Sequence, residues 1–126
     1  MLLTRLLLIA LGGALGSLAR YGLAGLVQGL TDKAFPWGTA TVNLLGCFAF
    51  GLVWSVLEEQ ITIAPEWRTL LLVGFMGAFT TFSTFAFESG QLLRDQQWLY
   101  AVGNIALQNG GGLILLLLGL ALGRLL

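Results

Sequence analysis

The sequence predicts an all-α integral membrane protein with four transmembrane helices. Of its 126 residues, 57% are hydrophobic and only 10% are charged, and the mean hydropathy is +0.89. A soluble domain carries about 25% charged residues, and so few charges would leave large apolar patches on its surface. Lipid is therefore the expected solvent. Long uncharged runs, separated by short polar connections, divide the chain into four spans.

The distribution of charge locates these spans. A membrane helix needs roughly 20 mainly apolar residues. The segments Trp37–Leu57, Thr69–Phe87 and Gln96–Gly123 contain no charged residue, whereas the first candidate carries Arg5 and Arg20. We predict spans at about residues 3–30, 36–57, 69–93 and 97–123. The connections between them are too short for a soluble domain, so residues 1–126 are expected to form a single transmembrane domain.

The N-terminal segment allows a second interpretation. Arg5, the apolar stretch 6–15 and Ser17-Leu18-Ala19 resemble a signal peptide with a cleavage site between small residues. The apolar pattern resumes after Arg20 and extends the segment to full membrane length. We therefore expect the segment to be retained as the first span.

The composition also excludes several classes of function. The formal net charge is zero, so nothing indicates a nucleic-acid partner. The single cysteine, Cys47, rules out an intrachain disulfide framework and is interpreted as a packing residue. Histidine, the commonest general base, is absent, and no nucleophile has an evident base nearby. The sequence predicts passive transport, not an enzyme.

Glycines at helix-contact spacing suggest close packing of the spans. The chain has 18 glycines, with i, i+4 pairs at Gly12/Gly16, Gly25/Gly29 and Gly119/Gly123. Small residues let helix backbones approach in lipid, where hydrophobic burial cannot drive association. Two interpretations remain open: the pairs pack helices of one chain together, or some of them meet a second copy.

The positive charges do not strongly favour one orientation of the chain in the membrane. Lys and Arg normally concentrate on the cytoplasmic side. Arg5, Arg68 and Arg124 fall on the side of the termini and the middle connection, and Lys33, Arg94 and Arg20 fall on or nearer the other side. This balance is compatible with insertion in both orientations, and hence with an antiparallel dimer, although a set this small can balance by chance.

Two polar stretches carry the candidate chemistry. Thr39 and Asn43 lie four residues apart on one helix face, and an amide in lipid is costly unless it is satisfied. The segment 74–90 interleaves hydroxyl groups with phenylalanines. Such a segment favours a local break, whose exposed carbonyl oxygens suit a hard cation. Two purely structural alternatives remain open. Asn43 would form an interhelical hydrogen bond, and Phe79, Phe82 and Phe85 would form an aromatic packing stripe.

Three motifs occur in order along the chain: Gly13-x-x-Gly16-x-x-x-Arg20-Tyr21, Gly38-Thr39-x-x-x-Asn43-x-x-Gly46, and Gly74-x-x-Gly77-x-x-Thr80-Thr81-Phe82-Ser83-Thr84-Phe85. Together they resemble the fluoride channels of bacteria known as the CrcB or Fluc family. The resemblance covers nearly the whole chain, and the third motif is the most specific. In the fourth span, Asn104, Gln108 and Gly110-Gly111-Gly112 match no pattern that can be mapped.

The resemblance implies a fluoride-selective passive channel in the bacterial inner membrane, which exports cytoplasmic fluoride down its electrochemical gradient and so lowers fluoride toxicity. It implies an antiparallel, dual-topology homodimer in lipid, with a broken third helix, two pores and a structural sodium ion at its centre. The implied fluoride path comprises Asn43, Phe82, Phe85, Thr39, Thr81, Ser83 and Thr84; Glu88 and Arg20 would lie at the pore mouth, and the backbone carbonyls of Gly77 and Thr80 would hold the sodium.

Fluoride chemistry agrees with these residue types. Fluoride is strongly hydrated, so its path must replace water with donors such as the Asn43 amide and the hydroxyl groups. An anion should meet the positive edges of the Phe82 and Phe85 rings. Glu88 has a second interpretation, as a solvated residue at the end of the third span. Arg20 has two others, pairing with an acid or extension toward the interface.

Two other functions belong to different classes. A small multidrug exporter is also a four-span, dual-topology dimer, but it is expected to carry a carboxylate deep in its first span, where this chain has Arg20. A purely structural membrane protein would use the glycines and phenylalanines for packing alone. It leaves Asn43 and the clustered hydroxyl groups unexplained.

Overall fold

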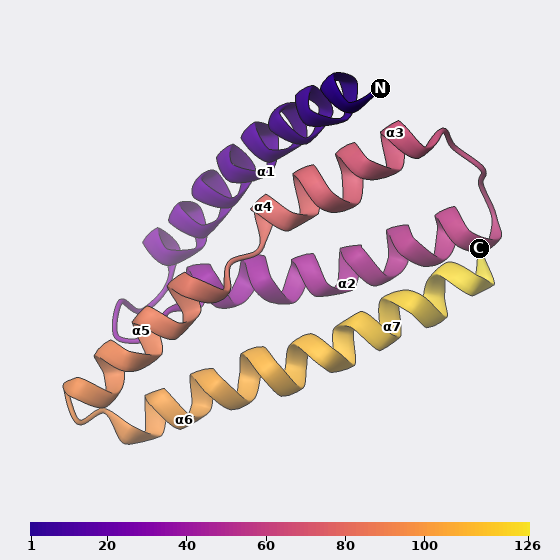
Figure 1. Cartoon of the computed structure of the whole chain (residues 1–126). Helices are drawn as coiled ribbons and strands as arrows, with labels where there is room; N and C mark the ends of the chain where they lie inside the picture. The colour runs from indigo at the N-terminus through magenta and orange to yellow at the C-terminus, as the bar shows by residue number, and fades with distance from the viewer.

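Four long helical segments make up the protein in the computed structural model, which describes all residues 1–126. They are α1 (Leu2–Leu30), α2 (Trp37–Glu59), a third segment over Pro65–Arg94 and a fourth over Trp98–Leu125. Each is long and apolar enough to cross a membrane. Both termini lie at the same end of the bundle, as an even number of spans requires (Figure 1).

The third segment starts earlier than the predicted span. Its first turn is α3 (Pro65–Arg68), which lies before the predicted boundary at residue 69. Proline is favoured at the first position of a helix because its missing N–H would have no partner there. Glu66 in the same turn also suits the positive end of the helix dipole. Pro65, which lies in the predicted connection between the second and third spans, therefore begins the helix.

The third segment is broken near its middle. A π-helix, η1 (Thr69–Met76), and a short turn, α4 (Gly77–Phe79), lead into two extended residues, and α5 (Phe82–Arg94) then continues the span. Thr80 has φ −94° and ψ 157°, and Thr81 has φ −147° and ψ 115°. The predicted break in the third helix is confirmed, and the connecting strand-like step is visible between α4 and α5 in Figure 1.

The fourth segment is continuous but not uniform. It consists of α6 (Trp98–Ala106), a π-helical turn η2 (Leu107–Gly111) and α7 (Gly112–Leu125). A π-turn rotates the following residues relative to an α-helix, and such turns are frequent at functional sites. The sequence analysis did not anticipate either π-helical stretch.

Glycines bring the helices into backbone contact. A Cβ atom on Gly12 would lie 3.0 Å from the backbone nitrogen of Phe75, and one on Gly16 would collide with the carbonyl oxygen of the same residue. A Cβ on Gly119 would collide with the carbonyl oxygen of Phe48 and lie 2.9 Å from the nitrogen of Leu52. These glycines therefore pack α1 against η1 and α7 against α2.

The third glycine pair has a different environment. A Cβ atom on Gly25 or Gly29 would meet nothing within 4 Å. Two of the three glycine pairs thus serve contacts within the chain, and the Gly25/Gly29 pair has no close neighbour from the same chain.

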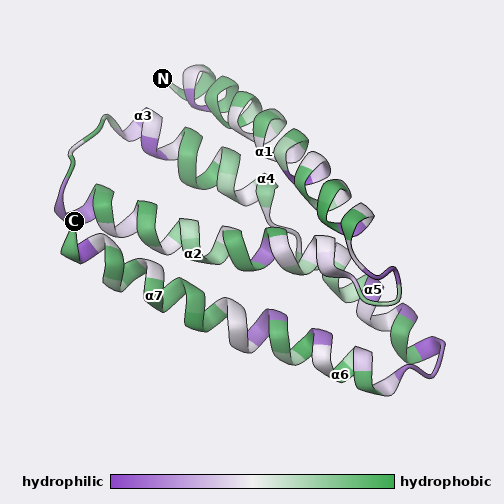
Figure 2. Cartoon of the chain, turned by 180° about the vertical axis from the view of Figure 1, so that it is seen from behind, coloured by the Kyte–Doolittle hydropathy of each residue, from purple (hydrophilic) through white to green (hydrophobic).

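Apolar side chains cover the outside of the bundle. Only 23 of the 126 residues are buried, as expected when lipid rather than a large internal core accommodates the apolar surface. Hydrophilic residues gather at the two ends of the bundle and in bands within α2 and along the fourth segment (Figure 2). The bands mark polar groups at the level of the membrane interior.

Candidate functional site

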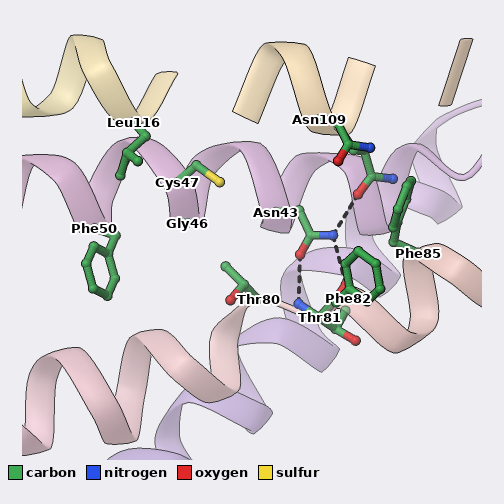
Figure 3. A pocket seen from close by; sticks show the side chains of 11 residues that line it. Asn43, Gly46, Cys47, Phe50, Thr80, Thr81, Phe82, Phe85, Asn109 and Leu116 are labelled. Atoms are coloured by element: carbon green, nitrogen blue, oxygen red, sulfur yellow. Dashed lines mark hydrogen bonds between the residues drawn. The ribbon is translucent and has the colours of Figure 1, made fainter. Parts of the chain in front are cut away.

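The break is held by a side chain from α2. The Asn43 Oδ1 accepts a hydrogen bond from the Thr81 backbone nitrogen at 2.7 Å, and Asn43 Nδ2 donates to the Thr81 carbonyl oxygen at 3.0 Å (Figure 3). Because Thr81 is extended, its N–H and C=O point to the same side, where one planar amide can bind both. Asn43 therefore satisfies the backbone groups that the broken helix leaves open.

The threonine hydroxyl groups of the break are engaged locally. Thr81 Oγ1 accepts from the Thr84 backbone nitrogen at 3.3 Å and donates to Thr84 Oγ1 at 3.0 Å, which makes Thr81 the N-cap of α5. Thr80 Oγ1 donates to the Met76 carbonyl oxygen at 3.2 Å. These bonds stabilise the two helix ends that face each other across the break.

Two carbonyl oxygens lose their helical donors at the same place. In a continuous helix the nitrogens of Thr81 and Thr84 would donate to the carbonyls of Gly77 and Thr80. Here those nitrogens donate to side-chain oxygens instead, and no backbone N–H bonds to either carbonyl. Gly77 is exposed on the surface of the single chain. The break therefore presents backbone oxygens that can accept a cation or a donor.

Arg20 reaches the break from α1. Its Nε donates to the Ala78 carbonyl oxygen at 2.9 Å, near the C-terminal end of α4, where a positive charge is favourable. Arg20 does not line the hollow around Glu88, and its place at a pore mouth stays a prediction. The structure thus gives Arg20 a backbone contact that was not predicted.

A groove of about 280 Å³ lies beside Asn43 and the break. Its lining comprises Asn43, Gly46, Cys47, Phe50, Thr80, Thr81, Phe82, Phe85, Gln108, Asn109 and Leu116. The rings of Phe82 and Phe85 are 5.5 Å apart between centroids and inclined by 58°, and both lie next to the Asn43 amide (Figure 3). Phe85 is only 7% exposed, whereas Phe82 is 75% exposed on the flank of the chain.

The fourth span supplies polar groups that the sequence analysis could not assign. Asn43 Nδ2 also donates to Gln108 Oε1 at 2.6 Å, Gln108 Nε2 donates to Asn104 Oδ1 at 2.8 Å, and Asn104 Nδ2 donates to Ser89 Oγ at 3.0 Å. We call Ser89, Asn104 and Gln108 the amide relay. One feature of the sequence could have indicated the amide relay. Asn104 and Gln108 lie four residues apart in a membrane helix, so their amides share a face and need hydrogen-bond partners.

Glu88 and Thr39 meet farther along the bundle. Thr39 Oγ1 donates to Glu88 Oε1 at 2.8 Å, and Glu88 Oε2 is buried without a hydrogen-bond partner. Glu88 also borders a second hollow of about 670 Å³, whose lining includes Lys33 and Asp95. Glu88 therefore connects the interior of the bundle with a charged hollow toward the end where α5 turns into α6.

The remaining predicted residue, Ser83, stands apart from this constellation. It is exposed and does not line the groove. The structure thus brings together Asn43, Thr81, Phe82 and Phe85 and joins Thr39 to Glu88. Thr84 bonds to Thr81 without lining the groove, and Ser83 lies outside both groups.

Comparison with known proteins identifies related chains over almost the full length. Residues 7–120 match the family described as CrcB-like protein, Camphor Resistance (CrcB). A "Fluoride-specific ion channel FluC" of Solidesulfovibrio magneticus is 55% identical over 125 residues, covering 99% of this chain and 100% of the relative. One of the same name from Nitratidesulfovibrio vulgaris (strain DSM 19637 / Miyazaki F) is 58% identical, covering 96% and 98%.

A third relative, from Nitrosococcus oceani and also named "Fluoride-specific ion channel FluC", is 53% identical over 118 residues, covering 94% of each chain. Identity at this level over nearly complete chains leaves no segment for a different fold. The chain belongs to the CrcB family.

Proposed function

We propose that this protein is a fluoride-selective passive ion channel that releases cytoplasmic fluoride across the bacterial inner membrane. The observation that carries the proposal is the groove in which an oriented amide and two phenyl rings line a break in a membrane helix. The relatives that share 53–58% of its residues are named fluoride-specific ion channels, which are not enzymes. A multidrug exporter or a structural protein is not favoured.

A second copy of the chain would complete the pathway. Phe82 is 75% exposed and lies on the rim of a groove that also holds Asn43. Acyl chains cannot satisfy polar groups, so an amide-lined groove open to lipid is unfavourable. A homodimer would cover this face, and the balanced positive charges support an antiparallel, dual-topology arrangement.

The groove offers fluoride only a few free donors. Both hydrogens of Asn43 Nδ2 are engaged, one by Thr81 and the other by Gln108. Gln108 Nε2 bonds to Asn104 and keeps its second hydrogen. The positive edges of Phe82 and Phe85 complete the set. Such contacts are individually weak, and conduction requires a site that an ion can leave as well as reach.

A structural sodium ion fits the freed carbonyl oxygens. The carbonyls of Gly77 and Thr80 lack backbone donors, and unwound backbone carbonyls are suitable ligands for this hard cation. The same two carbonyls from each of two chains would supply four ligands. The ion would hold the two breaks together across the dimer.

The proposed direction of transport follows from acid–base chemistry. Hydrogen fluoride crosses membranes as a neutral molecule and ionises in a less acidic cytoplasm, where the anion is trapped. A selective pore lets the anion leave down its gradient. Glu88, beside its charged hollow, would lie at the mouth of this path.

Anion efflux from liposomes tests the proposal. Vesicles containing the purified protein are loaded with potassium fluoride or potassium chloride, valinomycin is added, and each external anion is followed with an electrode. We expect rapid fluoride efflux without chloride efflux, and a strong loss of fluoride efflux in Phe82→Ile and Phe85→Ile. Folded protein that moves neither anion would refute the channel, and equal efflux of both anions would refute its selectivity.

A further inference from the structure

We propose that the amide relay is a positioning device. Gln108, held by Asn104 and Ser89, accepts a hydrogen bond from the Asn43 amide and holds it in place, and Asn43 in turn keeps Thr81 extended at the break. The proposal deepens the proposed fluoride function and rests on it, because Asn43 and Thr81 line the groove. The relay consists of hydrogen bonds within the chain, so it can be tested in the absence of fluoride.

The hydrogen bonds of the relay all run in one direction. The Thr81 N–H donates to Asn43, Asn43 to Gln108, Gln108 to Asn104, and Asn104 to Ser89. An amide has one accepting and one donating end, so the fixed Thr81 backbone determines which way Asn43 and each later amide point. A flipped Asn43 would set its oxygen against the oxygens of Thr81 and Gln108. Thr81 thus sets the orientation of Asn43, and Gln108 holds its Nδ2 end in place.

The local fold of the fourth span delivers Gln108 to this position. Gln108 lies in the π-turn η2, one helical turn after Asn104. A Cβ atom on Gly111 would lie 3.2 Å from Leu44 Cδ2, and one on Gly112 would lie 3.3 Å from Cys47 Sγ. Both glycines thus face side chains of α2. Their small size lets the Gln108 oxygen come within hydrogen-bond distance of Asn43.

Packing alone does not account for the relay. Asn104 is 0% exposed and Gln108 is 9% exposed, and buried amides carry a desolvation cost that apolar side chains of similar size avoid. What the amides add is a set of hydrogen bonds that holds the Asn43 side chain at a fixed place. That property is useful only if the Asn43 amide has to be held against Thr81.

The test follows the side-chain amide of Asn43 directly. Asparagine occurs only at positions 43, 104 and 109, so protein labelled with ¹⁵N-asparagine gives few side-chain NH₂ signals, and loss of a signal in Asn43→Ala identifies that residue. In fluoride-free micelles we expect both Asn43 hydrogens to exchange slowly with water. In Gln108→Met the exchange of one hydrogen should rise about tenfold, since one net hydrogen bond is lost.

A conservative variant distinguishes the hydrogen bond that Gln108 makes to Asn43 from the space that its side chain fills. Gln108→Glu keeps the length of the side chain and an oxygen that accepts from Asn43. Asn104 can turn toward the new carboxyl group because the Ser89 hydroxyl is able to donate as well as accept. We expect Gln108→Glu to restore slow exchange at Asn43. A side chain that only filled space would be replaced as well by methionine as by glutamate, and would show no such rescue.

Fluoride efflux tests whether loss of the relay affects transport. Gln108→Met and Asn104→Leu should each lower efflux about tenfold or more. Asn104 does not line the groove, so its effect reports on positioning, and Gln60→Met, at an exposed glutamine, should leave efflux unchanged. Unaltered Asn43 exchange in Gln108→Met would overturn the relay. If Gln108→Met does not fold, Asn104→Leu takes its place, because it removes the side chain to which Gln108 donates. Faster exchange at Asn43 in that variant would support the relay, and unaltered exchange would overturn it. A wild type with slow Asn43 exchange but no efflux would refute the channel and leave the relay intact.

Discussion

At the scale of single residues, Asn43 connects the sequence motif with the geometry of the break. Its amide binds both backbone groups of Thr81, as a neighbouring strand would. The sequence analysis left two interpretations of Asn43 open, an interhelical hydrogen bond and a residue of the ion path. The structure contains the hydrogen bond, and the position of Asn43 in the groove keeps the second interpretation as a proposal.

Replacement of Asn43 by alanine should destabilise the protein. Asn43→Ala leaves the Thr81 N–H and carbonyl without partners, and an unsatisfied buried group costs about 1–3 kcal/mol. We expect a clearly lower melting temperature in detergent micelles. Asn109→Ala is the matched control, since Asn109 is exposed and bonds only to Ile105 of its own helix. Equal melting of Asn43→Ala and wild type would contradict this role.

The relay could not be deduced from the sequence. Asn104 and Gln108 share a helix face by spacing, which is visible in the sequence. Their partners Asn43 and Ser89 come from α2 and α5, so the contact depends on how the fourth span packs against two others and on a π-turn in η2. The sequence specifies neither the relative register of the spans nor the turn.

At the scale of elements, the break in the third span is the feature that sequence reasoning found most directly. Clustered hydroxyl groups after two glycines predicted it, because hydroxyls replace lost backbone bonds. The Thr81 cap on α5 works in this way. The preceding π-helix η1 was not predicted, since its residues are apolar apart from Thr69 and their periodicity does not distinguish π from α geometry.

Arg20 should stabilise the first half of the broken helix. Arg20→Met removes the bond to the Ala78 carbonyl and a positive charge beside a helix C-terminus, which contributes up to about 2 kcal/mol in partly buried sites. We expect a lower melting temperature, partly restored in Arg20→Lys because the charge is kept. Arg5→Met on the same helix forms the control. A larger effect at Arg5 than at Arg20 would argue against the cap.

At the scale of the whole molecule, the groove lies at the surface of the single chain. Phe82, which lines it, is 75% exposed, and many other large apolar side chains are exposed as well. The number of spans followed from the distribution of charge, whereas the third segment starts at Pro65, before the boundary predicted at residue 69. The surface that would meet the proposed second copy could not be predicted, because exposed apolar residues face lipid and protein alike.

Dual topology can be tested by biasing the charges. Ile61→Arg with Thr62→Arg adds positive charge on the side of the termini, and Leu30→Arg with Thr31→Arg adds it on the other side. Each pair should force one orientation and abolish most fluoride efflux when expressed alone. Co-expression of the two should restore it. Full efflux from either variant alone would exclude an antiparallel dimer.

Cys47 gives the unmodified protein a chemical reporter. It is the only thiol in the chain and it lines the groove next to Asn43 and Phe82. No cysteine has to be removed or introduced before a thiol reagent is applied. The rate at which small methylating or mercurial reagents label the native chain therefore measures access to the groove, and the largest reagent that still reacts measures its width in a working membrane.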